Sequence, residues 1–126
     1  MQVKIDTKEK FHAITISESN LAANMTADLE QCLLPLLERE VKNVVLILKD
    51  TQILDEAAAN VLVRIQQSFY DAGSSFVICE LTPEVEKNLE NNGPLELMNV
   101  TPTESEAWDI VQMEELEREM LNDPDL

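Results

Sequence analysis

The stretch ILDEAAANVL, residues 53–62, places two carboxylates, Asp55 and Glu56, at the start of a predicted helix and three alanines after them. A carboxylate at a helix N-cap accepts a backbone N–H that has no partner within the helix. A carboxylate in the first turn also interacts favourably with the helix dipole. Alanines leave the helix start without bulk, so another surface could approach it closely. The stretch therefore predicts either a binding surface or a well-capped helix packed tightly on a sheet.

The sequence offers few groups for catalysis. No Ser or Cys stands in a nucleophile motif near the single histidine, His12, which we expect to be structural or on the surface. With only two glycines, the chain has no Gly-rich phosphate loop. It has no CxxC, and two adjacent carboxylates without further ligands make a poor cation site. We expect a protein without enzymatic activity, cofactor or metal.

The formal net charge is −16, from 25 acidic and 9 basic residues. Nucleic acid is an unsuitable partner, because phosphate contacts require Lys and Arg, and an anionic membrane surface is disfavoured for the same reason. A basic protein surface and simple solubility remain as alternative explanations of the charge. No apolar run reaches the length of a membrane span, and the charged N-terminus does not resemble a signal peptide. Because Cys32 and Cys79 lie in apolar runs, we expect buried free thiols and a cytoplasmic location.

Strand-like and helix-like segments alternate along the chain. The predicted strands cover residues 3–5, 11–17, 43–50, 74–81 and 95–100, and NVVLILKD (43–50) has the continuous apolar run of a strand buried on both faces. The first predicted helix begins at Met25, with Thr26 as a candidate cap and Pro35 as a break. The second begins at Ala57 or Ala58, and the third begins at Pro83 after a Thr82 cap. The fourth begins at a capping box formed by Thr103 and Glu106. Gly73 and Gly93 are expected to end the second and third helices. The order β-β-α-β-α-β-α-β-α predicts one α/β domain with a mixed, mostly parallel sheet of about five strands and about four helices.

The last predicted helix continues into QMEELEREMLNDPDL, which carries six carboxylates and one Arg. We expect a domain over residues 1–112, followed by an acidic helix extension and tail over residues 113–126. The predicted apolar stripe of this helix consists of Ala107, Ile110, Met113, Leu116 and Met120. The extension is either a solvated helix end or an acidic helix that docks on a basic partner, with Met113, Leu116 and Met120 as its apolar stripe.

The element order, the strand NVVLILKD and the helix entry ILDEAAANVL resemble the STAS domain, named for sulphate transporters and anti-sigma factor antagonists. The resemblance runs from Val3 to about Gln112 and includes the Gly before the strand SSFVICEL and the Glu-Ala of the last helix. In length, the chain is similar to the free-standing anti-sigma factor antagonists of bacteria. The resemblance implies a non-enzymatic regulator of transcription. It also implies a partner of the anti-sigma factor class with a histidine-kinase-like ATPase fold.

The chain departs from the family at the helix entry, where the family pattern is Asp-Ser-Ser/Thr-Gly. Asp55 and Glu56 fall on the Asp and the first Ser, Ala57 falls on the phosphoacceptor Ser or Thr, and Ala58 falls on the Gly. No hydroxyl lies between Asp55 and Gln67, and Thr51 is the one just upstream. In the family, phosphorylation at this position adds about two negative charges and drives the partner off. Because Ala57 cannot take that charge, the resemblance implies that the usual switch is missing.

Three consequences of that loss remain open. The first, which we favour, is that the protein binds its partner without phospho-control. The second is that Glu56 imitates the charged state. The third is that the domain serves as a scaffold or subunit of a lipid-transport or stress-sensing complex. The identity of the partner and the oligomeric state are left open. Since partners meet open parallel sheets beyond the carboxyl ends of the strands, we expect the partner surface there. Its predicted residues are Asn20, Leu21, Ala22, Ala23, Thr51, Gln52, Asp55, Glu56, Ala57, Ala58 and Asn60.

Overall fold

A computed structural model describes residues 1–121, without the side chain of Asn92. The strands are β1 (Val3–Thr7), β2 (Phe11–Ile16), β3 (Asn20–Leu21), β4 (Asn43–Ile47), β5 (Ile53–Leu54), β6 (Phe76–Cys79) and β7 (Val100–Thr101). The α-helices are α1 (Thr26–Leu33), α2 (Glu56–Asp71), α3 (Pro83–Asn92) and α4 (Glu104–Leu121). Short 3-10 helices cover Ala23–Met25, Leu34–Glu38 and Leu95–Leu97.

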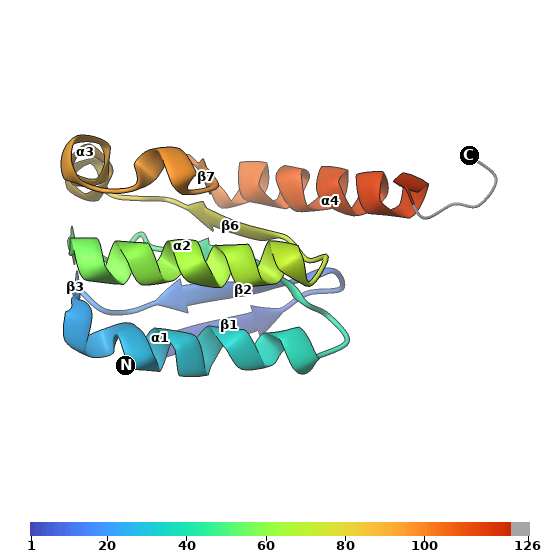
Figure 1. The fold of residues 1–126 in the computed structure, drawn as a ribbon, viewed down its shortest axis with the longest axis horizontal. Coiled ribbons are helices and arrows are strands. Elements are labelled where there is room, and N and C mark those ends of the chain that lie inside the picture. The colour runs from blue at the N-terminus through green and yellow to red at the C-terminus, as the bar shows by residue number, and fades with distance from the viewer. Residues whose placement is uncertain (122–126) are drawn as a thin grey trace.

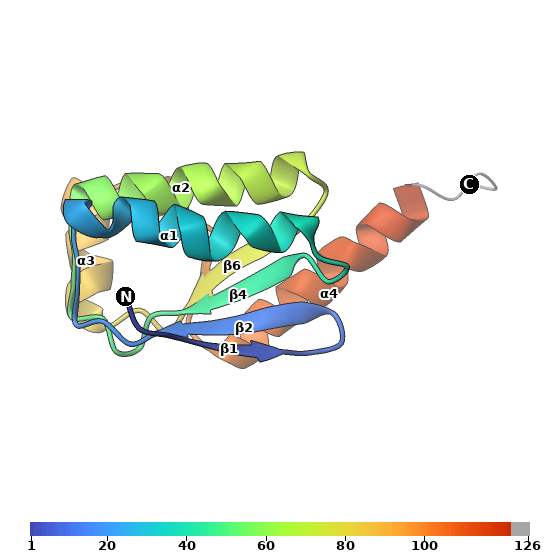
Figure 2. The ribbon, with the colours of Figure 1, turned by 90° about the horizontal axis from the view of Figure 1, so that it is seen from below.

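The main sheet has five strands in the order β1-β2-β4-β6-β7. β1 runs antiparallel to β2, and every other neighbouring pair is parallel. Helices α1 and α2 cover one face of this sheet and α4 lies on the other (Figures 1 and 2). The predicted α/β fold with a mixed, mostly parallel sheet is therefore confirmed.

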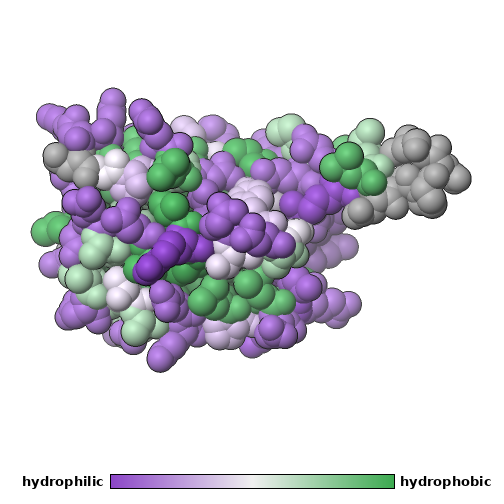
Figure 3. Space-filling model, in the orientation of Figure 1, coloured by the Kyte–Doolittle hydropathy of each residue, from purple (hydrophilic) through white to green (hydrophobic). Residues whose placement is uncertain are grey.

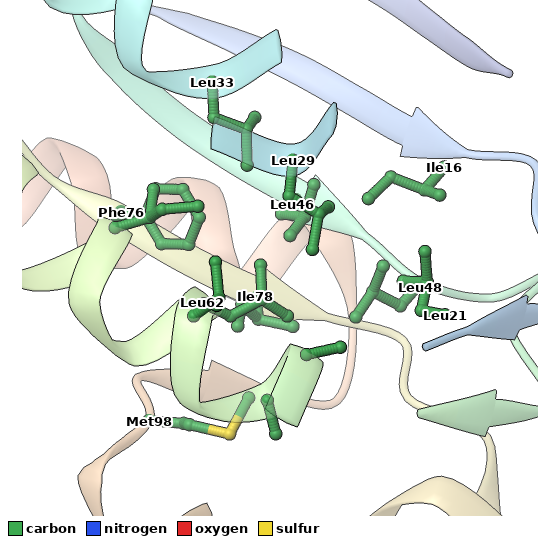
Figure 4. Packing of buried hydrophobic residues seen from close by; sticks show 14 of the residues in the cluster. Ile16, Leu21, Leu29, Leu33, Leu46, Leu48, Leu62, Phe76, Ile78 and Met98 are labelled. Atoms are coloured by element: carbon green, nitrogen blue, oxygen red, sulfur yellow. The ribbon is translucent and has the colours of Figure 1, made fainter. Parts of the chain in front are cut away.

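β4 is buried on both faces, as its apolar run predicts. Alternate residues point to opposite faces of a strand, so Val44 and Leu46 join the larger core against α1 and α2, while Val45 and Ile47 join a smaller core against α4. Figure 4 shows the larger core, in which leucines of both helices meet Phe76 and Ile78 of β6. The smaller core contains only two buried residues of α4, Ala107 and Val111.

Three of the predicted helix caps are confirmed. The Asp55 side chain accepts the N–H of Ala58 at the start of α2, and the Thr82 side chain accepts that of Val85 at the start of α3. Thr103 Oγ1 accepts the N–H of Glu106 at 3.1 Å and lies 3.4 Å from the Glu106 carboxylate. Gly73, predicted to end α2, follows its last turn with φ of 75°, a left-handed conformation that glycine adopts at little cost.

Several local predictions are wrong. Residues 20–21, predicted to lie in a loop, form β3, and the predicted strand 95–100 is a 3-10 turn followed by β7. Thr26 does not cap α1, because its hydroxyl donates to the carbonyl of Ala23. The predicted break at Pro35 is confirmed, because α1 ends at Leu33 and a 3-10 helix follows over Leu34–Glu38.

The predicted apolar stripe of α4 is divided between the core and the surface. Ala107 is buried and Ile110 packs half-buried against the smaller core, whereas Met113, Leu116 and Met120 are 53–56% exposed. α4 continues past residue 112 and runs unbroken to Leu121, as expected for a helix extension, and the division of the chain at residue 112 stays a prediction. Residues 122–126 of the predicted tail lie outside the described part.

The His12 side chain is buried, with Nδ1 2.9 Å from Thr7 Oγ1 and Nε2 2.8 Å from the Val41 carbonyl oxygen. It ties β1 and β2 to the segment before β4, which fits the expected structural role. Both cysteines are free, Cys79 fully buried and Cys32 half-buried. Within residues 1–121, none of the helices is both long enough and apolar enough to traverse a membrane.

The two thiols are expected to differ sharply in reactivity. Burial raises the pKa of Cys79 to about 12, with the carboxylates of Glu80 and Glu104 adding to the shift. Because the thiolate is the reactive species, about one Cys79 thiol in ten thousand is ionised at pH 8. An aromatic disulfide reagent should label Cys32 first and Cys79 only on unfolding or as the pH approaches 12. In a Cys32→Ser variant, fast labelling in native buffer at pH 8 would contradict this.

Candidate partner-binding site

Two segments far apart in the sequence lie side by side beyond the carboxyl ends of the main strands. β3 and β5 pair in parallel, with Asn20 opposite Ile53 and Leu21 opposite Leu54. The Ser19 carbonyl accepts the N–H groups of Gln52 at 2.8 Å and Ile53 at 2.9 Å. The segment before α1 and the segment before α2 thus form one continuous surface at the edge where β3 appears in Figure 1.

The carboxylate of Asp55 joins these two segments. Its Oδ1 accepts the N–H of Ala58 at 2.8 Å, which caps α2, and its Oδ2 accepts the N–H of Ala23 at 2.9 Å, across 32 positions of sequence. The backbone N–H of Asp55 donates to the Leu21 carbonyl at 3.0 Å. One residue therefore fixes both the start of α2 and the chain that leads into α1.

Six of the predicted site residues are exposed on this surface. They are Asn20, Ala23, Gln52, Glu56, Ala57 and Asn60. Ala22 and Asp55 are half-buried. The structure does not bring Leu21, Thr51 and Ala58 to the surface: each is 0% exposed, so their side chains support the surface from beneath and cannot touch a partner.

Thr51 is the nearest hydroxyl upstream of the helix start, and it is enclosed. Its Oγ1 donates to the Glu18 carbonyl at 2.9 Å, and its own carbonyl accepts from Thr82 Oγ1 at 3.3 Å. A fully buried and hydrogen-bonded hydroxyl is not accessible to a phosphate donor. Ser19, by contrast, is exposed on the neighbouring segment and was missed from the sequence.

Ile53 is the second residue that sequence reasoning missed. It is 57% exposed, whereas Leu54 beside it is 2% exposed. Since successive side chains of a strand point to opposite sides, the pair Ile53–Leu54 must place one apolar side chain outside. The signal was present as two adjacent apolar residues at a predicted strand end. The exposed isoleucine gives this surface a large apolar side chain suited to contact with a protein partner.

Within residues 1–121, no group of three or more His, Cys, Asp and Glu side chains is placed to hold a metal ion. The surface formed by the segments before α1 and α2 is suited to contact with another protein. It consists of one apolar side chain, small alanines, amides and the exposed carboxylate of Glu56.

Comparison with known proteins identifies the family to which this architecture belongs. The STAS domain family model matches residues 2–107. The solved structure of RsbS from Moorella thermoacetica, carrying a serine-to-glutamate substitution, superposes with a TM-score of 0.72 at 20% identity, covering 94% of this chain and 99% of that chain. An anti-sigma factor antagonist from Mycobacterium paratuberculosis gives a TM-score of 0.74 at 14% identity, covering 88% and 93%.

A chain from the stressosome structure gives a TM-score of 0.66 at 18% identity, covering 86% of this chain and 96% of that chain. No curated protein sequence matches the chain significantly. At these identities the structural likeness concerns the fold alone, whereas the family model covers most of the sequence. The chain therefore belongs to the STAS domain family.

Proposed function

We propose that the chain is a non-enzymatic regulatory protein-binding domain whose partner contacts the α2 entry surface. We define this surface by its exposed residues: Asn20, Ala23, Gln52, Ile53, Glu56, Ala57 and Asn60. The observation that carries the proposal is the Asp55 carboxylate, which holds the two contributing segments in one arrangement through Ala58 and Ala23. A surface that is ordered before binding loses less entropy when a partner docks.

Binding at this surface would be independent of phosphorylation. Ala57 occupies the position that the family pattern assigns to the phosphoacceptor, and it is exposed in the first turn of α2. Phosphorylation at a helix N-terminus acts by adding charge and bulk, neither of which an alanine can acquire. The buried hydroxyl of Thr51 offers no substitute. The domain would thus remain in the state that binds its partner.

The partner class we favour is an anti-sigma factor with a histidine-kinase-like ATPase fold, in the cytoplasm. The likeness to solved anti-sigma factor antagonists supports this choice. The alternative is a scaffold role in a stress-sensing assembly, which the likeness to a stressosome chain supports. In the first role the α2 entry surface would bind an anti-sigma factor, and in the second it would bind another protein of the assembly.

The first test is an affinity pull-down from the lysate of the source organism, with mass spectrometry, using wild type beside Ala57→Glu. A histidine-kinase-like ATPase should be captured by wild type and lost with Ala57→Glu, because the new side chain adds charge and bulk to the exposed first turn of α2. Ala72→Glu is the matched control, since Ala72 is an exposed alanine at the other end of α2. Equal capture by all three proteins would place the partner surface elsewhere.

Replacement of Asp55 separates binding from stability. Asp55→Ala and Thr103→Ala each remove one helix cap, which should lower the free energy of unfolding by about 1 kcal/mol. Only Asp55→Ala also releases Ala23, so only this variant should lose partner affinity, measured by calorimetry with the captured ATPase. If Thr103→Ala loses as much affinity as Asp55→Ala, the effect is general destabilisation and Asp55 has only a capping role.

A hydroxyl restored at position 57 should restore the phosphoacceptor. Incubated with the captured ATPase and ATP, Ala57→Ser should gain one phosphate in its intact mass, while wild type gains none. Fragment spectra should place the phosphate at position 57. Phosphorylation of wild type at Ser19, the exposed hydroxyl beside the surface, would contradict the proposed loss of phospho-control.

A further inference from the structure

The second half of α4 has its polar side toward the sheet. Glu114 accepts from the Tyr70 hydroxyl at 2.7 Å, and Glu115 accepts from the Asn43 amide at 2.8 Å. The Arg118 guanidinium donates to Ser75 Oγ at 3.1 Å and to Asn43 Oδ1 at 3.3 Å. Asn43 and Ser75 are buried, so the contacts of Glu115 and Arg118 clamp the helix to the amino end of the sheet, while Glu114 joins it to Tyr70 of α2. This part of α4 is held by these hydrogen bonds and by the ion pair of Glu115 with Lys10 at 3.6 Å, with no fully buried apolar residue after Val111.

The apolar side of the same segment faces outward. Met113, Leu116 and Met120 are 55%, 56% and 53% exposed. At 3.6 residues per turn, these three positions fall on one stripe, opposite the stripe of Ala107, Val111 and Arg118 that meets the sheet. We call Met113, Leu116 and Met120 the outer stripe. Three large exposed side chains on one helix stripe are the pattern of an amphipathic helix that lacks its partner.

The outer stripe lies where another chain can reach it. α4 projects beyond the sheet, on the side away from α3, in two perpendicular views (Figures 1 and 2). In Figure 3 hydrophobic atoms appear on the projecting end of α4 among hydrophilic ones. The STAS family match ends at residue 107, so the stripe lies beyond the matched residues. It is also at the opposite end of the strands from the α2 entry surface.

Charge selects the kind of partner. α4 carries seven carboxylates and one cationic side chain, that of Arg118, which is directed inward. Helical geometry places the exposed Glu117 and Glu119 on either side of the outer stripe and Asp109 at its beginning. An anionic membrane would be repelled by this surface. A second copy of the chain would bring carboxylates against carboxylates, which destabilises helix pairing.

We propose that the outer stripe docks a basic amphipathic helix of a partner protein. Apolar side chains of that helix pack on Met113, Leu116 and Met120, and its Lys and Arg side chains face Asp109, Glu117 and Glu119. The flexible thioethers of the two methionines adapt to the shapes of different apolar side chains. This interaction uses a surface separate from the α2 entry surface, so the domain could hold two proteins at once.

The five methionines provide an internal readout when their methyl groups are labelled with ¹³C. The probe is a synthetic helix of Leu and Lys with its leucines on one face. Its addition should shift the methyl signals of Met113 and Met120. The signals of Met98, buried in the larger core, and Met25, near the α2 entry surface, should stay in place. A shift of Met25 without Met113 and Met120 would overturn the proposal and leave the proposed function untouched.

The affinity of the labelled probe, measured by fluorescence anisotropy, gives the second test. The triple variant Met113→Gln, Leu116→Gln, Met120→Gln should bind at least tenfold more weakly, while Ile5→Gln with Leu97→Gln, exposed apolar residues elsewhere, should bind like wild type. Glutamine has a helix propensity close to that of Leu and Met, so the melting temperature of the triple variant should match that of wild type. Binding should also weaken when salt rises from about 0.1 M to about 1 M, because the Debye length falls from about 10 Å to about 3 Å.

Three further results would overturn the proposal. Equal affinity for wild type and the triple variant would exclude the outer stripe as the docking site. Equal affinity for a scrambled Leu–Lys peptide without an apolar face would mean that charge alone attracts the probe. Methyl shifts of Met113 and Met120 that depend on protein concentration in the absence of the probe would assign the stripe to a second copy of the chain.

Discussion

Much of the structure follows from the burial of β4 on both faces. From Val44 to Leu48 no residue is more than 5% exposed, so helices must cover the sheet on both sides. α1 and α2 cover the side with the larger core, and the first turns of α4 cover the other. Because β2, β4, β6 and β7 are parallel, the connections after them emerge at one edge. The segment before α1 and the segment before α2 therefore become neighbours.

At that edge the free N–H groups of two helical starts share one acceptor. A helix leaves its first N–H groups without partners inside the helix, and Asp55 satisfies that of Ala58 in α2 and that of Ala23 in the turn before α1. The same carboxylate that stabilises the helix thus determines the shape of the exposed surface around it. This dual role of Asp55 explains why the exposed surface at the start of α2 is ordered in the absence of a partner.

Unlike α1 and α2, α4 meets the sheet with apolar side chains only in its first turns and with polar side chains farther along. Ala107 and Val111 pack on the apolar face of β4 and β6, but farther along the helix the neighbours on the sheet are Asn43 and Ser75. Polar neighbours favour Glu115 and Arg118 on the inner side, and the regular turn of the helix then directs Leu116 and Met120 outward. The exposed apolar residues are thus a consequence of how the helix is anchored.

The sequence by itself determined the features that depend on near neighbours along the chain. These are the doubly buried strand 43–47, the caps Asp55, Thr82 and Thr103, the end of α2 at Gly73, and the order of the main elements. A cap or a buried strand can be recognised locally because its hydrogen bonds or its run of apolar side chains lie within a few residues. The family resemblance added the expectation that Ala57 stands at the phosphoacceptor position, which no local pattern indicates.

Only the tertiary structure decided the pairing of β3 with β5, the burial of Thr51, the exposure of Ile53 and the orientation of α4. Strands of two residues are too short to show a period, and their hydrogen bonds join residues more than thirty positions apart in the chain. For α4, the helical period shows which residues share a face. It does not show which face meets the sheet, because that depends on whether the opposing residues are apolar or, like Asn43 and Ser75, polar.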